Sequence, residues 1–103
     1  MSTASVKLAL TDRHAVALTI WGEARGESLE GRVAVGMIIK NRVRHPRRWA
    51  SDWRKVCHQR WQFSCWQRSG GGDNHESVMA WARHFVAHVS SNESDSVALR
   101  VPD

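Results

Sequence analysis

Apolar side chains recur every three or four residues in three stretches of this chain, a spacing that predicts amphipathic helices. These stretches run over about Asp12–Glu23, Leu29–Val43 and His75–Val89. A shorter helix is predicted over about Trp53–His58. The only β-structure that we expect is a short strand over Val97–Val101. The pattern therefore predicts a mainly α fold.

Polar residues suited to helix capping stand directly before the predicted helices. Thr11 precedes the first helix, Ser28 precedes the second, and Ser51 or Asp52 precedes the short one. The side-chain oxygens of such residues accept the N–H groups that the first helical turn leaves unpaired. Pro46 sets the latest end of the second helix, because the residue before a proline disfavours helical dihedral angles.

The segments between the helices lack this periodicity. We expect a frayed start over Met1–Ala9 and an irregular or extended segment over Gln59–Trp66. Ser69–Asn74 contains a run of glycines and is predicted to form a loop. The polar segment Ser90–Ser96 is predicted to be disordered.

The second predicted helix is apolar on most of its sides. Its large apolar residues are Val33, Val35, Met37, Ile38, Ile39 and Val43. A helix with this pattern is expected in the protein interior. Gly31 and Gly36 would let a neighbouring helix approach closely. We therefore expect Leu29–Val43 to be the central buried helix.

The chain is basic, with a formal net charge of +5, which indicates a polyanionic partner: nucleic acid, anionic lipid or cell-wall polymer. Between Lys40 and Arg68, nine Lys or Arg stand against one acid, Asp52. The tryptophans interleaved with these bases are Trp49, Trp53, Trp61 and Trp66. This composition fits a groove for sugar rings or a nucleic-acid surface. Two or three of these tryptophans can equally be core residues.

The cysteines and two of the histidines leave alternatives open. Cys57 and Cys65 can close a small disulfide loop or remain two buried thiols. His84 and His88 stand four residues apart on the last predicted helix, a spacing compatible with a metal ion. No third ligand is evident nearby, so we expect solvated histidines, no metal site and no cofactor.

Glu23 is the strongest candidate for chemistry. It stands between Gly22 and Gly26, at the end of an apolar helix. Burial at this position would favour the protonated carboxyl group, as a proton donor near neutral pH requires. Glu27 follows four residues later, and Arg25 can pair with either carboxylate. The alternative is that both are ordinary surface carboxylates at a helix terminus.

Four short motifs in order resemble the spore cortex-lytic cell-wall hydrolase family. They are Gly22–Glu27, Glu30–Val35, Asn41–Val43 and Gln62–Ser64, within a resemblance that covers roughly Ala15–Trp66. The resemblance implies a small, single lysozyme-like domain over residues 1–103 that cleaves the glycan strand of peptidoglycan.

The resemblance also implies roles for individual residues. Glu23 becomes the catalytic acid/base of a lytic transglycosylase or a muramidase, and Glu27 a supporting or capping group. Other residues that we expect to contact substrate are Arg25, Gln62, Phe63, Ser64 and Trp66. Of these, Gln62 and Ser64 are the expected polar contacts of the groove.

One departure separates the chain from that family, whose members continue into a tyrosine-bearing extended segment. This chain has no tyrosine, so that wall of the groove is missing, shortened or rebuilt from Val97–Val101. The alternatives are therefore a non-catalytic peptidoglycan-binding module and a basic nucleic-acid-binding module without sequence specificity. Val6–Leu10 is too short for a signal-peptide core. We accordingly expect a monomer made in the cytoplasm, such as a phage lysis protein (an endolysin), that acts at the cell wall or periplasm after release.

Overall fold

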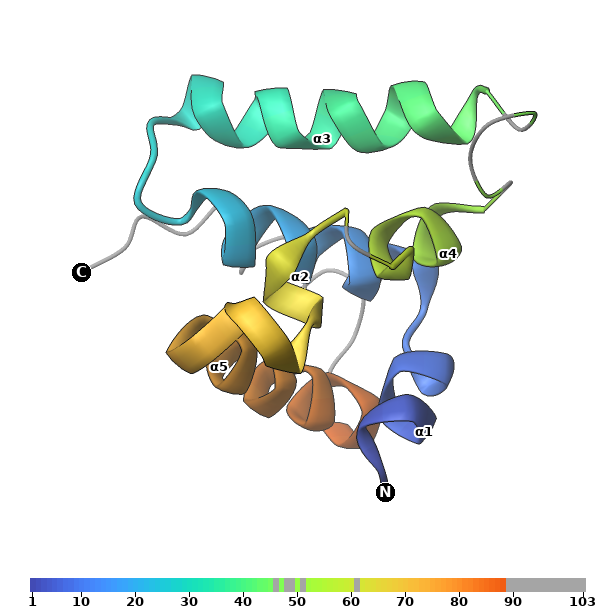
Figure 1. Cartoon of the computed structure of the whole chain (residues 1–103), viewed down its shortest axis with the longest axis vertical. Coiled ribbons are helices and arrows are strands. Elements are labelled where there is room, and N and C mark those ends of the chain that lie inside the picture. The colour runs from blue at the N-terminus through green and yellow to red at the C-terminus, as the bar shows by residue number, and fades with distance from the viewer. Residues whose placement is uncertain (46, 48–49, 51, 61, 89–103) are drawn as a thin grey trace.

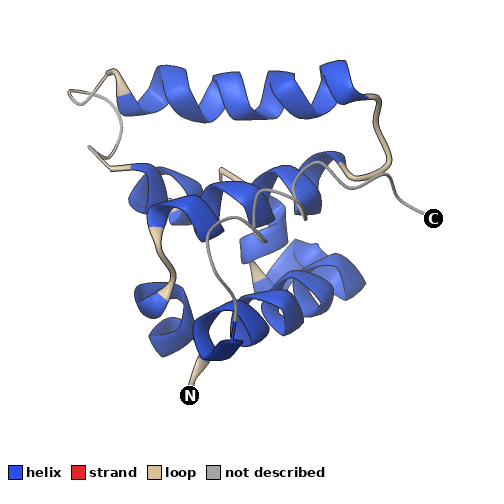
Figure 2. Cartoon of the chain, turned by 180° about the vertical axis from the view of Figure 1, so that it is seen from behind, coloured by secondary structure: helices blue, strands red, loops and turns tan. Residues whose placement is uncertain are grey.

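The computed structural model describes residues 1–45, 47, 50, 52–60 and 62–88. The elements in chain order are α1 (Thr3–Ala9), α2 (Asp12–Ala24), α3 (Leu29–Val43), α4 (Trp53–His58), the 3₁₀ helix η1 (Ser64–Trp66) and α5 (Arg68–His88). The described residues form only helices, turns and loops (Figure 2). The predicted mainly α fold is confirmed.

Helix α2 occupies the middle of the structure. It lies between α3 on one side and α5 on the other (Figure 1). It also contacts α4 and η1, while α1 packs against α5. Small residues along α2 allow neighbours on several sides. Those that are buried are Ala15, Ala17, Gly22 and Ala24.

The predicted helix caps are present. The Thr11 hydroxyl accepts the N–H of His14 at 3.0 Å, and the Ser28 hydroxyl accepts the N–H of Gly31 at 3.3 Å. For α4 the cap is Asp52, whose Oδ1 accepts the N–H of Lys55 at 2.8 Å. The three predicted helices that follow these caps end within one residue of their predicted positions.

The core gathers between α2, η1 and α5. Val78, Ala82 and Phe85 form the buried stripe predicted for the last helix; Val89 lies outside the described residues. Leu18 from α2 and Trp66 from η1 pack into the same cluster. Burying aliphatic and aromatic side chains of this size contributes about 1.5–3 kcal/mol each.

Helix α3 is not the central buried helix that its composition predicted. Leu29, Val33, Met37 and Ile38 have exposed fractions of 59%, 53%, 45% and 44%. The buried residues of α3 are Arg32 and Ile39. The helix packs by one face on α2 and α4 and lies at the edge of the structure (Figure 1). A helix that is apolar on every side becomes fully buried only if other elements pack on opposite faces of it. In this fold the neighbours of α3 pack on a single face.

The N-terminus and the glycine run also differ from prediction. Thr3–Ala9 is the helix α1, capped by Ser2, and it buries Val6. The glycine run belongs to the first turns of α5 instead of a separate loop. Gly70 and Gly72 have φ of +89° and +52° there, angles that glycine adopts without strain. The predicted segments Ser90–Ser96 and Val97–Val101 lie outside the described residues.

Both cysteines are buried free thiols, which decides between the two alternatives that the sequence left open. Burial raises the pKa of the Cys57 thiol to about 12. Burial likewise raises the pKa of the Cys65 thiol, and the neighbouring Glu23 carboxylate adds to the increase. Both side chains therefore behave as small apolar core groups at neutral pH.

His58 is placed to make stability depend on pH. Its ring lies edge-on to Trp66, with ring centroids 4.4 Å apart. Burial, together with the charges of Lys7 and Arg54, lowers the pKa of His58 to about 3, while Asp52 acts in the opposite direction. An unfolded histidine has a pKa of about 6.5, so between these values the unfolded state binds more protons. Stability contributed by His58 is therefore lost as pH falls below about 6.5.

We expect the free energy of unfolding to fall by about 2 kcal/mol between pH 7 and pH 5 on account of His58 alone. Urea unfolding at both pH values measures the change. The His58→Gln variant should lose this portion of the pH dependence, because its side chain does not titrate. His45→Gln, at an exposed position, should keep it. An unchanged pH dependence in His58→Gln would refute the assignment.

No helix in the described part of the chain combines the length and the apolar character that a bilayer crossing requires.

Candidate functional site

Glu23 lies in the last turn of α2, with its side chain exposed. Its Oε2 accepts a hydrogen bond from the backbone N–H of Cys65 at 3.2 Å. This bond joins residues 42 positions apart and fixes the carboxylate where α2 meets η1. The sequence suggested that Glu23 could be buried, but the described residues do not bury its side chain.

Gly22 makes this arrangement possible. A Cβ atom at this position would stand 2.8 Å from both the Cys65 Cβ and the Val78 Cγ2. Cβ contacts that short essentially never occur, so a side chain at residue 22 would push η1 and α5 away from α2. Gly22 therefore allows the close approach of α2 to η1 and α5 that brings the Cys65 N–H within reach of Glu23.

Two residues of α5 complete the framework. The Asn74 side-chain N–H₂ donates to the Gly22 carbonyl oxygen at 2.6 Å. The His75 Nδ1 lies 3.1 Å from the Cys65 carbonyl oxygen and is buried. We call Gly22, Glu23, Cys65, Asn74 and His75 the junction. Its backbone groups are held from both sides, so η1 cannot shift relative to Glu23 without breaking hydrogen bonds.

Sequence reasoning missed Asn74 and His75. The signal that was available is their position directly after a run of glycines, at the predicted start of the last helix. Such positions often carry polar groups that cap or contact neighbouring backbone. The Asn74 Oδ1 is buried and has no hydrogen-bond partner in the described part of the chain.

Of the predicted substrate contacts, two reach the surface next to the junction. Ser64 is exposed at the start of η1, directly before Cys65. Gln62 is half-buried, and its backbone N–H donates to the Gln59 carbonyl oxygen at 3.2 Å. Ser64 therefore stands next to the residue that hydrogen-bonds Glu23, while Gln62 lies three residues before that residue.

Phe63 and Trp66 belong to the core. Phe63 is 5% exposed, with the Arg42 guanidinium 5.1 Å from its ring centroid. Trp66 is 2% exposed, and its indole N–H donates to the Thr19 hydroxyl at 2.8 Å. Neither ring offers an open face for a sugar. Trp53 also packs against the core, whereas Trp49 and Trp61 lie outside the described residues.

Arg25 and Glu27 lie in the turn that follows α2. The Arg25 guanidinium stacks over Trp21, 4.3 Å from the ring centroid. No ion pair joins it to Glu23 or Glu27 in the part of the chain that the structure describes. The Glu27 side chain is exposed, and its backbone carbonyl accepts from the Arg32 Nη2 at 3.1 Å. Glu27 thus stabilises the start of α3 through its backbone, and the supporting role of its side chain stays a prediction.

The histidine pair does not extend to a larger cluster. His84 and His88 are exposed, with ring centroids 5.4 Å apart. Among the described residues, no three His, Cys, Asp or Glu side chains are grouped as metal ligands.

The fold and the junction define a class: a small helical domain that presents one fixed carboxylate at a helix end. The family described as cell wall hydrolase matches residues 26–98, more than half of the chain. The chain therefore belongs to the cell wall hydrolase family, which confirms the family predicted from the motifs. Peptidoglycan is accordingly its substrate and the cell wall is where it acts. No curated protein and no solved structure matches the chain.

The limits of this match differ from those of the predicted resemblance. It begins at Gly26, three residues after Glu23, and continues beyond Trp66 to residue 98. Glu27 and the junction residues of η1 and α5 lie within it, whereas Gly22 and Glu23 do not. The role of Glu23 therefore depends on the geometry of the junction and on the motif around it.

Proposed function

We propose that this protein cleaves the glycan strand of peptidoglycan with Glu23 as its single general acid/base. The observation that carries the proposal is the hydrogen bond from the Cys65 N–H to Glu23 Oε2. It orients an exposed carboxylate on the surface where Ser64, the residue directly before Cys65, is also exposed. A glycan lying there would cover the carboxylate, exclude water and favour its protonated form.

The reaction then needs two proton transfers by one residue. Protonated Glu23 donates its proton to the glycosidic oxygen as the bond to the leaving sugar breaks. The resulting carboxylate accepts a proton from the 6-hydroxyl of the muramic acid as that oxygen attacks the anomeric carbon. The Cys65 N–H stabilises the ionised form between these steps.

The number of carboxylates favours internal attack. Glycosidases that use water or an enzyme nucleophile commonly place two carboxyl groups about 5–9.5 Å apart. In the described structure Glu23 is the one carboxylate that hydrogen-bonds within the junction, and Glu27 is engaged through its backbone at the start of α3. Attack by the sugar's own hydroxyl requires no second carboxylate, so a lytic transglycosylase is the preferred reading and a muramidase the alternative.

Digestion of purified sacculi, followed by mass spectrometry of the soluble products, tests this function. We expect muropeptides that end in anhydromuramic acid. Reducing muramic acid ends would show attack by water and hence a muramidase. Fragments cut only within the peptide stems would overturn glycan-strand cleavage.

The exposure of Glu23 also favours a second candidate, a module that binds peptidoglycan without cleaving it. An exposed carboxylate can hold a glycan by hydrogen bonds without transferring a proton to it. Sedimentation with sacculi combined with a turbidity assay separates the two functions. Binding without clearance between about pH 5 and 8 would establish the module.

A further inference from the structure

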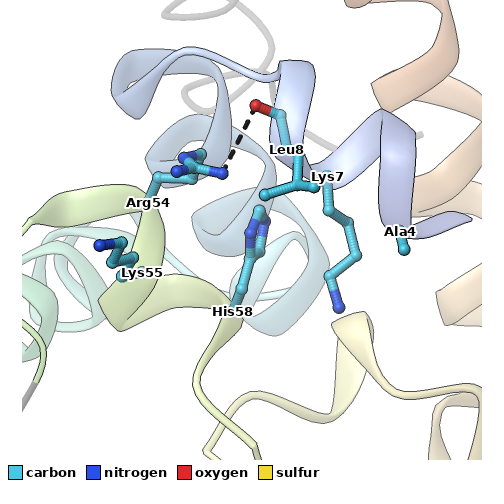
Figure 3. A pocket seen from close by; sticks show the side chains of 6 residues that line it. All are labelled: Ala4, Lys7, Leu8, Arg54, Lys55 and His58. Carbon is cyan, nitrogen blue, oxygen red and sulfur yellow. Dashed lines mark hydrogen bonds between the residues drawn. The ribbon is translucent and has the colours of Figure 1, made fainter.

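A cavity of about 420 Å³ lies between α1 and α4 (Figure 3). Its lining residues are Ala4, Lys7, Leu8, Arg54, Lys55 and His58. Three of these six carry a positive charge and none is acidic. We call this cavity the basic pocket. It shares no residue with the junction, and nothing in the proposed glycan cleavage uses it.

Lys7 is the residue that points to a ligand. Its side chain is half-buried, and its ammonium group forms no hydrogen bond or ion pair with any described residue. Burial lowers the pKa of Lys7. A cation that loses hydration without gaining a partner is unfavourable, and an anion in the pocket would remove this cost.

The other two cations that line the pocket are Arg54 and Lys55. The Arg54 Nη1 donates to the Leu8 carbonyl oxygen at 3.4 Å, which ties α4 to α1 at the pocket (Figure 3). The Lys55 ammonium is 3.7 Å from the Asp52 carboxylate, in a largely exposed pair that water screens. Arg54 therefore keeps most of its N–H donors, and Lys55 is free to turn toward a bound anion.

We propose that the basic pocket binds a phosphate ester. Three cations around one cavity match a group with up to two negative charges that presents oxygens in several directions. The guanidinium fork and the two ammonium groups are the donors that phosphate oxygens use most. The volume exceeds that of a phosphate group, and Leu8 and Ala4 supply an apolar wall for the sugar- or glycerol-sized part of the ester.

Two sources share this chemistry: a free phosphate ester and a repeating phosphodiester polymer. Binding of glycerol phosphate and of a short poly(glycerol phosphate) is measured by calorimetry and by amide chemical shifts. Acetate at the same ionic strength is the reference anion. We expect saturable binding of one or both probes, with shifts centred on α1 and α4, and no saturable response to acetate. If the polymer binds more tightly per phosphate than glycerol phosphate does, the natural ligand is a polymer. If the two probes bind equally per phosphate, the natural ligand is a free ester.

The Lys7→Met variant removes the charge and keeps the unbranched stem that packs in the pocket. We expect it to weaken binding about tenfold or more, in line with the loss of one charge-assisted hydrogen bond. Lys40→Met, on α3 and not among the residues that line the pocket, should bind as the wild type does. Lys55→Met, at a more exposed position, is the second variant and should weaken binding in the same direction even if Lys7→Met folds poorly.

Three results would overturn the proposal. They are the absence of saturable binding by either probe, an equal response to acetate, and wild-type affinity in a folded Lys7→Met. All these readouts are independent of glycan cleavage, so they stand whether or not Glu23 proves to be catalytic.

Discussion

Glu23→Gln should lower the release of soluble muropeptides from sacculi by about a hundredfold to ten-thousandfold, the range that a general acid/base contributes. Glutamine has the same shape and can still accept the Cys65 N–H through its carbonyl oxygen, but it has no proton to transfer at the glycosidic oxygen. Circular dichroism and thermal unfolding should therefore match the wild type. The initial rate of sacculus solubilisation measures the effect.

Two further variants make this result specific. Glu30→Gln, in the exposed first turn of α3, should keep wild-type activity. Glu27→Gln should lose less than about tenfold, since the described role of Glu27 is carried by its backbone carbonyl. Glu27 lies inside the family match and Glu23 outside it. Full activity in Glu23→Gln together with inactive Glu27→Gln would therefore transfer the catalytic role to Glu27.

Gly22→Val should destabilise the protein by roughly 3 kcal/mol, because it overfills a packed interface. Its Cβ alone would stand 2.8 Å from atoms of Cys65 and Val78, both of which are fully buried and have no room to move. Replacing a helical glycine recovers at most about 1 kcal/mol of backbone entropy, so the steric effect dominates. Urea unfolding measures the loss. Activity should fall as well, since displacement of Cys65 removes the N–H that orients Glu23.

Gly26→Val is the matched control for this prediction. A Cβ at Gly26 meets no atom within 4 Å, and its φ lies outside the left-handed region. We expect its stability to remain within about 1 kcal/mol of the wild type, as for other surface changes. If Gly22→Val were as stable as Gly26→Val, the close packing of α2 on η1 and α5 would be incorrect.

The sequence alone predicted most of what depends on short-range interactions. The bounds of α2, α3 and α4 follow from periodicity and from caps three residues away, such as Thr11 and Ser28, whose hydrogen bonds are local. The buried stripe Val78, Ala82 and Phe85 follows from helical spacing. The short motifs were sufficient to identify the family, and the one around Glu23 to single out that residue.

Which helices and side chains are buried could be determined only from the tertiary structure. The composition of α3 predicted an interior helix, yet α2 took that position, because its small residues admit neighbours on more sides. From the sequence, the aromatic rings of Phe63 and Trp66 could either stack on a sugar ring or pack in the hydrophobic core. Only the packing of η1 against α2 and α5 placed them in the core.

The arrangement of the candidate sites was likewise beyond the sequence. The Cys65 N–H reaches Glu23 across 42 positions, and the Asn74 amide reaches the Gly22 carbonyl across 52. The basic pocket brings Lys7 of α1 together with Arg54 of α4, two helices that are far apart in the sequence. A backbone N–H group is present at nearly every residue, so the sequence does not mark which one will contact Glu23. A cavity forms only when two helices pack, so its lining cannot be read from the sequence. Residue types and local spacing therefore determined the helices and the candidate acid, while the partners of that acid were decided by which helices came together.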